Sequence, residues 1–191
     1  MSEPVGPTED GGTRGRVLVS VPALPDDNFD RTVVYVIDHD SSGAIGVVLN
    51  RPSELEVPAE IRLGPSWASP DVMFEGGPVS PEAVIVLGRR KLGEDLAGAA
   101  PVGGTVAVLT ADAVENHEVG GVDLLRAYAG YAGWGPGQLD AELEAGVWVV
   151  LDVPPDDVFS SAPVDLWRSV LTRQGGRLAA IGRHPVDPSV N

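Results

Sequence analysis

Short runs of β-branched and aliphatic residues, interrupted by glycine, proline and acidic residues, most constrain how this chain can fold. The two strongest runs are residues 32–37 and 44–49, and the turn-forming stretch 38–43 separates them. Runs of this length and composition are typical of buried strands, and a connection of about six residues favours a hairpin. The sequence therefore predicts a hairpin whose first strand is central in a β-sheet.

The remaining apolar runs predict further strands and then helices. Strands are expected at residues 16–21, 72–74, 83–87, 105–109 and 147–151, and helices at 53–63, 111–118, 137–145 and 163–174. Because the strands come early and the main helices late, we expect an α+β fold. The prediction is a single domain with a mixed, largely antiparallel β-sheet of about six strands, flanked by three or four helices. Residues 1–14 are expected to be a disordered N-terminal tail, residues 15–182 the domain, and residues 183–191 a C-terminal tail.

Charge and composition exclude several classes of function. With 13 basic and 28 acidic residues among 191, the acidic chain carries a net charge of −15, which repels phosphate backbones and anionic membranes. The one basic cluster, Arg89 to Lys91, is interpreted as a solvated turn. The absence of cysteine excludes disulfides, thiolate zinc sites and a cysteine nucleophile. No uncharged run is long enough for a membrane span and no signal peptide is recognisable, so we expect a cytoplasmic protein.

Few residue patterns point to chemistry. His39 lies between Asp38 and Asp40, so it is either a general base or metal ligand, or part of a hairpin turn whose acids cap backbone N–H groups. Neither an H-E-x-x-H nor a G-x-S-x-G pattern is present. We therefore assign no catalytic residue, no metal site and no cofactor. Gly76 and Gly77 indicate either a tight turn against packed backbone or the floor of a small pocket.

Aromatic residues and glycines are concentrated in one segment. Tyr131 and Trp134 stand among closely spaced glycines, so residues 128–137 are predicted to be a loop rather than a core strand. Gln138 and Glu142 follow at i and i+4 on the next predicted helix, where they can face each other. They would either hydrogen-bond a ligand or hold the loop in place.

This segment carries a family resemblance. Residues 130–143, GYAGWGPGQLDAEL, followed by Trp148, resemble the hallmark of the YqgE/AlgH family of bacterial proteins. Residues 22–33 and 38–52, the sequence GGPV at 76–79 and Trp167 match the family in order, so the similarity covers roughly residues 15–177. The resemblance implies an α+β fold with a mixed sheet, and one branch is named as a transcriptional regulator. It implies no catalytic residues, and direct DNA binding is disfavoured because no helix-turn-helix pattern is visible and the charge is acidic.

The polar and glycine positions that recur in the family suggest one ligand-binding region. We expect the following residues to converge in space: Asn50, Arg51, Gly76, Gly77, Tyr131, Trp134 and Gln138. Arg51 would bind an anionic group, Trp134 would offer a stacking face and Gln138 would orient the ligand. The expected function is a non-enzymatic binding or regulatory protein that acts through an unknown protein partner or a small anionic ligand. The alternative is an enzyme acting on a small anionic metabolite, with His39 or a carboxylate as the base.

Overall fold

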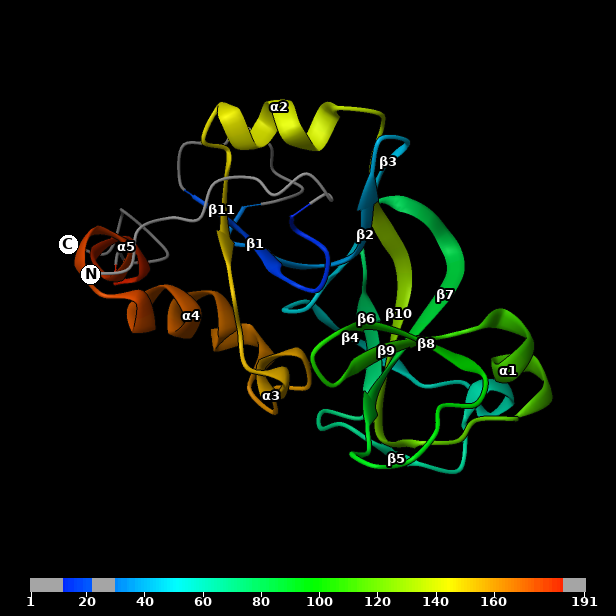
Figure 1. The fold of residues 1–191 in the computed structure, drawn as a ribbon. Helices are drawn as coiled ribbons and strands as arrows, with labels where there is room; N and C mark the ends of the chain where they lie inside the picture. Colours follow the sequence, from blue (N-terminus) through cyan, green and yellow to red (C-terminus); the bar gives the residue numbers. More distant parts are fainter. Residues whose placement is uncertain (1–11, 22–29, 184–191) are drawn as a thin grey trace.

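The computed structural model describes residues 12–21 and 30–183, which fold into a curled, mostly antiparallel sheet with short helices around it (Figure 1). The strands are β1 (Val17–Ser20), β2 (Val33–Asp40), β3 (Gly43–Val48), β4 (Pro52–Glu56), β5 (Ser66–Trp67), β6 (Val72–Glu75), β7 (Val79–Arg90), β8 (Ala99–Gly103), β9 (Val106–Leu109), β10 (Val122–Trp134) and β11 (Trp148–Leu151). The α-helices are α1 (Ala111–Asn116), α2 (Gln138–Glu144), α3 (Pro155–Val158), α4 (Leu166–Gln174) and α5 (Gly176–Gly182), with 3-10 turns η1 (Ala59–Ile61) and η2 (Pro163–Asp165).

The predicted α+β class is confirmed, but the predicted numbers of elements were too low. The described residues contain eleven strands rather than about six, and five α-helices rather than three or four. The missed elements are short or irregular: β8 is rich in alanine, glycine and proline, and α5 follows α4 directly. The residues 1–11, 22–29 and 184–191, which include most of both predicted tails and part of the family motif, lie outside the described residues.

The strands run in the order β11-β1-β2-β3-β10-β7-β9-β8; beside this path, β5 and β6 pair with β10, and β4 pairs with β6. Figure 1 shows α2 at the top of the half formed by β11, β1, β2 and β3, with α3, α4 and α5 at the lower left of that half. Helix α1 lies at the right, on the side of β7, β8 and β9. None of the described helices combines the length and apolarity that crossing a membrane requires.

The predicted hairpin is confirmed as β2 and β3, which pair from Val34 opposite Val48 to Asp40 opposite Gly43. Val33 through Ile37 are all buried, because β1 and β3 flank the strand and both of its faces carry packed side chains. A strand covered on both faces shows a continuous apolar run rather than alternation, which explains the pattern in the sequence.

The predicted loop at residues 128–137 was wrong for most of its length. Residues up to Trp134 belong to β10, the 13-residue strand that pairs with β3, β5, β6 and β7. Glycine is compatible with this strand because Gly130 takes a φ of +68° at a bulge, where the pairing with β7 shifts between Ala129 and Tyr131. Cross-strand pairing therefore overrides the loop character of the local sequence.

The predicted helix at residues 53–63 was also wrong, since this segment forms β4 followed by the 3-10 turn η1. Strand β4 pairs with β6, and the Ser53 hydroxyl donates to the Met73 carbonyl oxygen at 2.8 Å. Pro52 is the first residue of β4. Weak helix propensity yields here to tertiary pairing.

The largest apolar cluster joins the two halves of the sheet to α4. It includes Tyr35 of β2, Phe74 of β6 and Tyr128 of β10 together with Trp167 of α4. The Trp167 ring N–H donates to the Ser20 carbonyl oxygen at 2.9 Å, which attaches α4 to β1. On α4, Trp167, Val170 and Leu171 are buried, whereas Val164, within the predicted helix 163–174, is exposed in η2.

Candidate functional site

The backbone of three distant segments meets where β3, β6 and β10 come together. The Val48 N–H donates to the Gly76 carbonyl oxygen at 2.9 Å, and the Gly76 N–H donates to the Ala129 carbonyl oxygen at 2.8 Å. The Glu75 N–H donates to the Arg51 carbonyl oxygen at 2.9 Å. The structure thus brings the double-glycine bend next to Arg51 on one side and to β10 on the other.

The two glycines of the bend are required by packed backbone. A Cβ at Gly76 would lie 2.2 Å from the Gly130 carbonyl oxygen, and one at Gly77 would lie 2.2 Å from the Tyr131 carbonyl carbon. Gly77 also has a φ of +152°, which side-chain-bearing residues rarely adopt. Of the two alternatives for this motif, the geometry corresponds to a tight turn against packed backbone.

Asn50 and Arg51 are both anchored to the start of β2. The Asn50 side chain accepts a hydrogen bond from the Val33 N–H at 2.9 Å and donates to the Arg31 carbonyl oxygen at 2.8 Å, so it bridges backbone. The half-buried Arg51 guanidinium donates to the Thr32 hydroxyl at 3.3 Å. No carboxylate lies within ion-pair distance of Arg51 in the part of the chain that the structure describes.

Trp134 and Gln138 are held by Glu142, in agreement with the alternative in which these residues hold the segment. The Glu142 carboxylate accepts hydrogen bonds from the Trp134 ring N–H at 2.8 Å, from the Trp148 ring N–H at 2.7 Å and from the Gln138 amide at 2.9 Å. Gln138 also accepts a hydrogen bond from the Gly135 N–H at 3.1 Å. This network attaches α2 to β10 and β11.

Tyr131 and Trp134 face opposite sides of the sheet. Side chains three residues apart in a strand point to opposite faces. Accordingly, Tyr131 packs against the cluster that contains Tyr35 and Phe74, whereas Trp134 belongs to the cluster that contains Leu139 of α2. The junction therefore contains Arg51, Gly76, Gly77 and the start of the Tyr131 segment, with Asn50 beside it. Trp134 instead pairs with Ala44, at the other end of β3, and Gln138 lies on α2.

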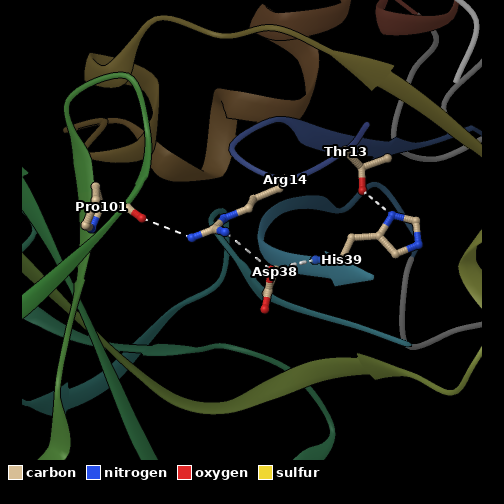
Figure 2. Close-up of polar contacts among 5 residues, drawn as sticks. All are labelled: Thr13, Arg14, Asp38, His39 and Pro101. Atoms are coloured by element: carbon tan, nitrogen blue, oxygen red, sulfur yellow. Dashed lines mark hydrogen bonds and ion pairs between the residues drawn. The ribbon is translucent and has the colours of Figure 1, made fainter. Parts of the chain in front are cut away.

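His39 connects three parts of the chain, and Figure 2 shows its contacts with Thr13 and Asp38. Its Nδ1 lies 2.8 Å from the Thr13 hydroxyl, and its Nε2 lies 3.6 Å from the Asp140 carboxylate of α2. Its backbone N–H donates to the Asp38 carboxylate at 3.1 Å. Thr13, which belongs to the predicted N-terminal tail, is buried here, and so is His39. His39 therefore links β2 to the segment before β1 and to α2.

A bulge in β2 determines which way His39 points. Val36 pairs with Gly46 and Asp38 pairs with Ile45, so Ile37 is an extra residue. Because of this extra residue, His39 pairs with Ala44, which packs against the apolar cluster that contains Trp134 and Leu139. Without the extra residue, the His39 side chain would lie on the other face of the strand, away from α2.

The acids on either side of His39 are exposed and cap backbone N–H groups, as in the hairpin-turn alternative. Asp40 accepts a hydrogen bond from the Ser42 N–H at 2.7 Å, and Asp38 also lies 3.7 Å from Arg14. Figure 2 shows Arg14 reaching in the other direction to the Pro101 carbonyl oxygen, 3.1 Å away.

Two surface hollows lie away from Arg51. One of about 270 Å³ is lined by residues that include Asp38, Asp40, Ser42 and Trp134, at the turn between β2 and β3. The other, of about 490 Å³, lies beside α1. The acidic wall of the first hollow does not suit an anion. Among the described residues, no group of three or more histidine, aspartate and glutamate side chains is placed to hold a metal ion.

Two of the three residues in the basic cluster at the end of β7, Arg89 and Lys91, contact acids. Arg89 donates two hydrogen bonds to Asp123 at 2.9 and 3.0 Å, and these hold the pKa of Asp123 below its ordinary value. Lys91 lies 3.4 Å from Glu94. The cluster therefore does not form a strip of unpaired positive charge.

The sequence patterns did not single out Thr13, Asp140 or Arg126 as partners of other segments. Thr13 stands in a polar glycine-rich stretch and Asp140 on the wet side of a helix, so neither carries a local signal. Arg126 did carry a local signal, because it is a charged residue within a run of apolar residues. In the structure this run is part of β10, and Arg126 is 1% exposed.

Comparison with known proteins identifies the family. The model of a family described as AlgH-like matches residues 17–179. A UPF0301 protein of Streptomyces avermitilis is 44% identical over 195 residues, covering 97% of this chain and 99% of that protein. One from Thermobifida fusca is 45% identical over 197 residues, covering 93% and 94%.

Two solved structures share the fold. A crystal structure of a Corynebacterium diphtheriae protein has a TM-score of 0.81 at 27% identity, covering 96% of this chain and 95% of that one. The solution structure of the AlgH protein from Pseudomonas aeruginosa has a TM-score of 0.66 at 26% identity, covering 97% and 100%. The predicted resemblance is thereby confirmed, and the chain belongs to the AlgH-like family.

Proposed function

We propose that this protein is a non-enzymatic binding or regulatory protein that recognises a small anionic ligand, or an acidic group of a protein partner, through Arg51. The observation that carries the proposal is the state of this guanidinium. The guanidinium is half-buried, and within the described residues its one polar contact is the hydroxyl of Thr32. A guanidinium has five N–H donors in a planar fork that matches carboxylate and phosphate groups.

In this proposal, the other expected site residues support Arg51 rather than all touching the ligand. Asn50 attaches the strand end to β2, and the Gly76–Gly77 bend holds the Arg51 backbone against β10. Trp134 and Gln138 bind Glu142 and so stabilise α2. A rigid frame of this kind reduces the conformational entropy that ligand binding would otherwise cost.

The enzymatic alternative rests on His39, which contacts both a hydroxyl and a carboxylate. However, Thr13 is 4% exposed and His39 is 8% exposed. A reacting group would have to displace packed side chains before it reached the ring. For this reason we favour the binding role.

A regulatory role would pass through a protein partner rather than through DNA. The net charge of −15 repels the phosphate backbone, and Arg89 and Lys91 of the basic cluster at the end of β7 are paired with acids. We propose that the protein acts in the cytoplasm of a bacterial cell.

The test is a thermal-shift screen of nucleotides and anionic metabolites against the wild-type protein and Arg51→Ala. A ligand present at a hundred times its Kd raises the free energy of unfolding by about 2.7 kcal/mol, which appears as a higher melting temperature. We expect at least one anion to produce this rise in the wild-type protein and no rise in Arg51→Ala.

Arg177→Ala is the matched control, since it removes the same charge from an exposed position on α5. It should keep the full ligand-dependent rise. A ligand that stabilises the wild-type protein and Arg51→Ala equally would overturn the assignment of Arg51.

A further inference from the structure

Within the residues that the structure describes, the interior of the molecule contains a cation that has no anion beside it. Arg126 of β10 is 1% exposed. Its guanidinium donates to the Val158 carbonyl oxygen at 3.2 Å, the Ser69 carbonyl oxygen at 2.7 Å and the Ser160 carbonyl oxygen at 2.9 Å. No carboxylate within residues 12–21 and 30–183 lies in ion-pair distance of it. Three neutral carbonyl groups solvate the charge but do not neutralise it.

Three buried polar atoms in this region lack a described hydrogen-bond partner. They are the Nε atom of Arg126 and the hydroxyl groups of Tyr35 and Tyr128. Tyr35 is 1% exposed and Tyr128 is fully buried, so water at the surface does not satisfy them. Such groups are uncommon in proteins, and each one calls for a specific explanation.

The three groups belong to one neighbourhood. The Arg126 guanidinium lies 4.4 Å from the centre of the Phe74 ring, and that ring lies 5.7 Å from the Tyr128 ring. Tyr35, Phe74 and Tyr128 share one apolar cluster. Burial raises the pKa of Tyr128, whereas Arg126 opposes that rise through its charge and through a side-chain contact with the Tyr128 hydroxyl, and Tyr35 adds to the rise. Both residues therefore lie close enough to act on this hydroxyl.

We propose that Arg126, Tyr35 and Tyr128 form an interior binding site for one small monovalent anion of the halide class. Two hydroxyl groups and one N–H supply donors, and the adjacent guanidinium supplies the positive charge. Among the described residues around these groups, hydrogen-bond donors outnumber acceptors. A halide accepts hydrogen bonds and donates none, so it needs no acceptors in return. A water molecule would bring two further protons that need acceptors. This site is separate from Arg51 and does not depend on the function proposed above.

The first test measures thermal unfolding at constant ionic strength while sodium gluconate is replaced stepwise by sodium chloride or bromide. Constant ionic strength removes the general screening of a chain with a net charge of −15. A halide at ten times its Kd should lower the unfolding equilibrium constant about elevenfold, which raises the melting temperature. Equal melting temperatures in gluconate, chloride and bromide would overturn the proposal.

The variants Tyr35→Phe and Tyr128→Phe keep the aromatic ring and remove one donor each. Each should lose most of the halide-dependent rise while remaining folded in gluconate. Tyr131→Phe is the matched control, because its half-buried ring is not among the groups of this site, and it should keep the rise. If Tyr35→Phe and Tyr128→Phe keep the full rise, the anion binds elsewhere and the proposal fails.

Crystals grown in bromide give an independent result. We expect an anomalous bromide peak within hydrogen-bond distance of both tyrosine hydroxyls. Ordered water alone at that position would show that the donors bind solvent and would overturn the assignment of an anion.

Discussion

At the scale of single residues, three glycines allow strands to approach one another more closely than side chains permit. Gly76 and Gly77 of the bend and Gly130 of β10 lie where the backbone of one segment touches that of another. A Cβ at Gly130 would lie 2.6 Å from the Gly77 carbonyl oxygen, so the requirement is mutual. The position of Arg51 depends on this contact, because the residue before Gly76 donates to the Arg51 carbonyl group.

The variant Gly76→Ala tests this contact. Its Cβ would meet the Gly130 carbonyl oxygen at 2.2 Å, and backbone cannot move away as a flexible side chain can. We expect a loss on the order of 3 kcal/mol in the free energy of unfolding, measured by urea denaturation. Gly64→Ala is the control, since no atom lies within 4 Å of its Cβ, and it should be neutral or slightly stabilising. Equal stability of the two variants would contradict the packed-backbone interpretation.

At the scale of elements, α2 is attached to the sheet by one carboxylate. The helix has seven residues, too few to be stable in isolation. Its stability therefore comes from contacts, namely Leu139 in the apolar cluster and Glu142 with the ring N–H groups of β10 and β11. The link from His39 to Asp140 adds a third attachment.

The variant Glu142→Gln tests this attachment. An amide has one acceptor oxygen instead of two and no charge, and hydrogen bonds to charged groups contribute about 1.5–3 kcal/mol. We expect a loss of about 2 kcal/mol in the free energy of unfolding and a red shift in tryptophan fluorescence, because the indole N–H groups of Trp134 and Trp148 lose their charged acceptor. Glu144→Gln, on an exposed position of the same helix, should change neither value. A Glu142→Gln protein that behaves like this control would refute the role.

Local sequence predicted some elements well and others badly, for a physical reason. The hairpin of β2 and β3 was predictable because both strands are apolar and the turn between them is short. The end of β10 was not, since its glycines suggest a loop and its strand conformation depends on β3 and β7, which are distant in sequence. Of the candidate site, the proximity of Arg51, the bend and β10 was expected, but the opposite orientation of Tyr131 and Trp134 follows from the strand.

At the scale of the whole molecule, the core that joins the two halves of the sheet contains buried ionisable groups. Burial raises the pKa values of Tyr35 and Tyr128 well above the ordinary value for tyrosine. A hydroxyl whose pKa is raised in the folded state favours folding at full strength below the unfolded pKa. That contribution is lost as pH rises from the unfolded towards the folded pKa.

The sign of this effect predicts alkaline instability. Above about pH 10 the unfolded chain releases two protons that the folded chain retains, so stability falls by about 2.7 kcal/mol per pH unit. Lysine side chains contribute little to this slope, because Lys91 is the only lysine. Urea denaturation between about pH 9 and pH 11 measures the slope, which Tyr35→Phe or Tyr128→Phe should halve. A slope that Tyr35→Phe and Tyr128→Phe leave unchanged would show that other groups control it.

Local periodicity and motifs were enough to predict the α+β class, the central hairpin and the family, because each of these is visible in a short stretch of sequence. Contacts between distant segments were needed to show that β10 continues through its glycines, that Glu142 accepts hydrogen bonds from two indole N–H groups and that the buried Arg126 lies close to Tyr128. These arrangements depend on pairing and burial between residues far apart in the chain, and local propensity carries no information about such contacts.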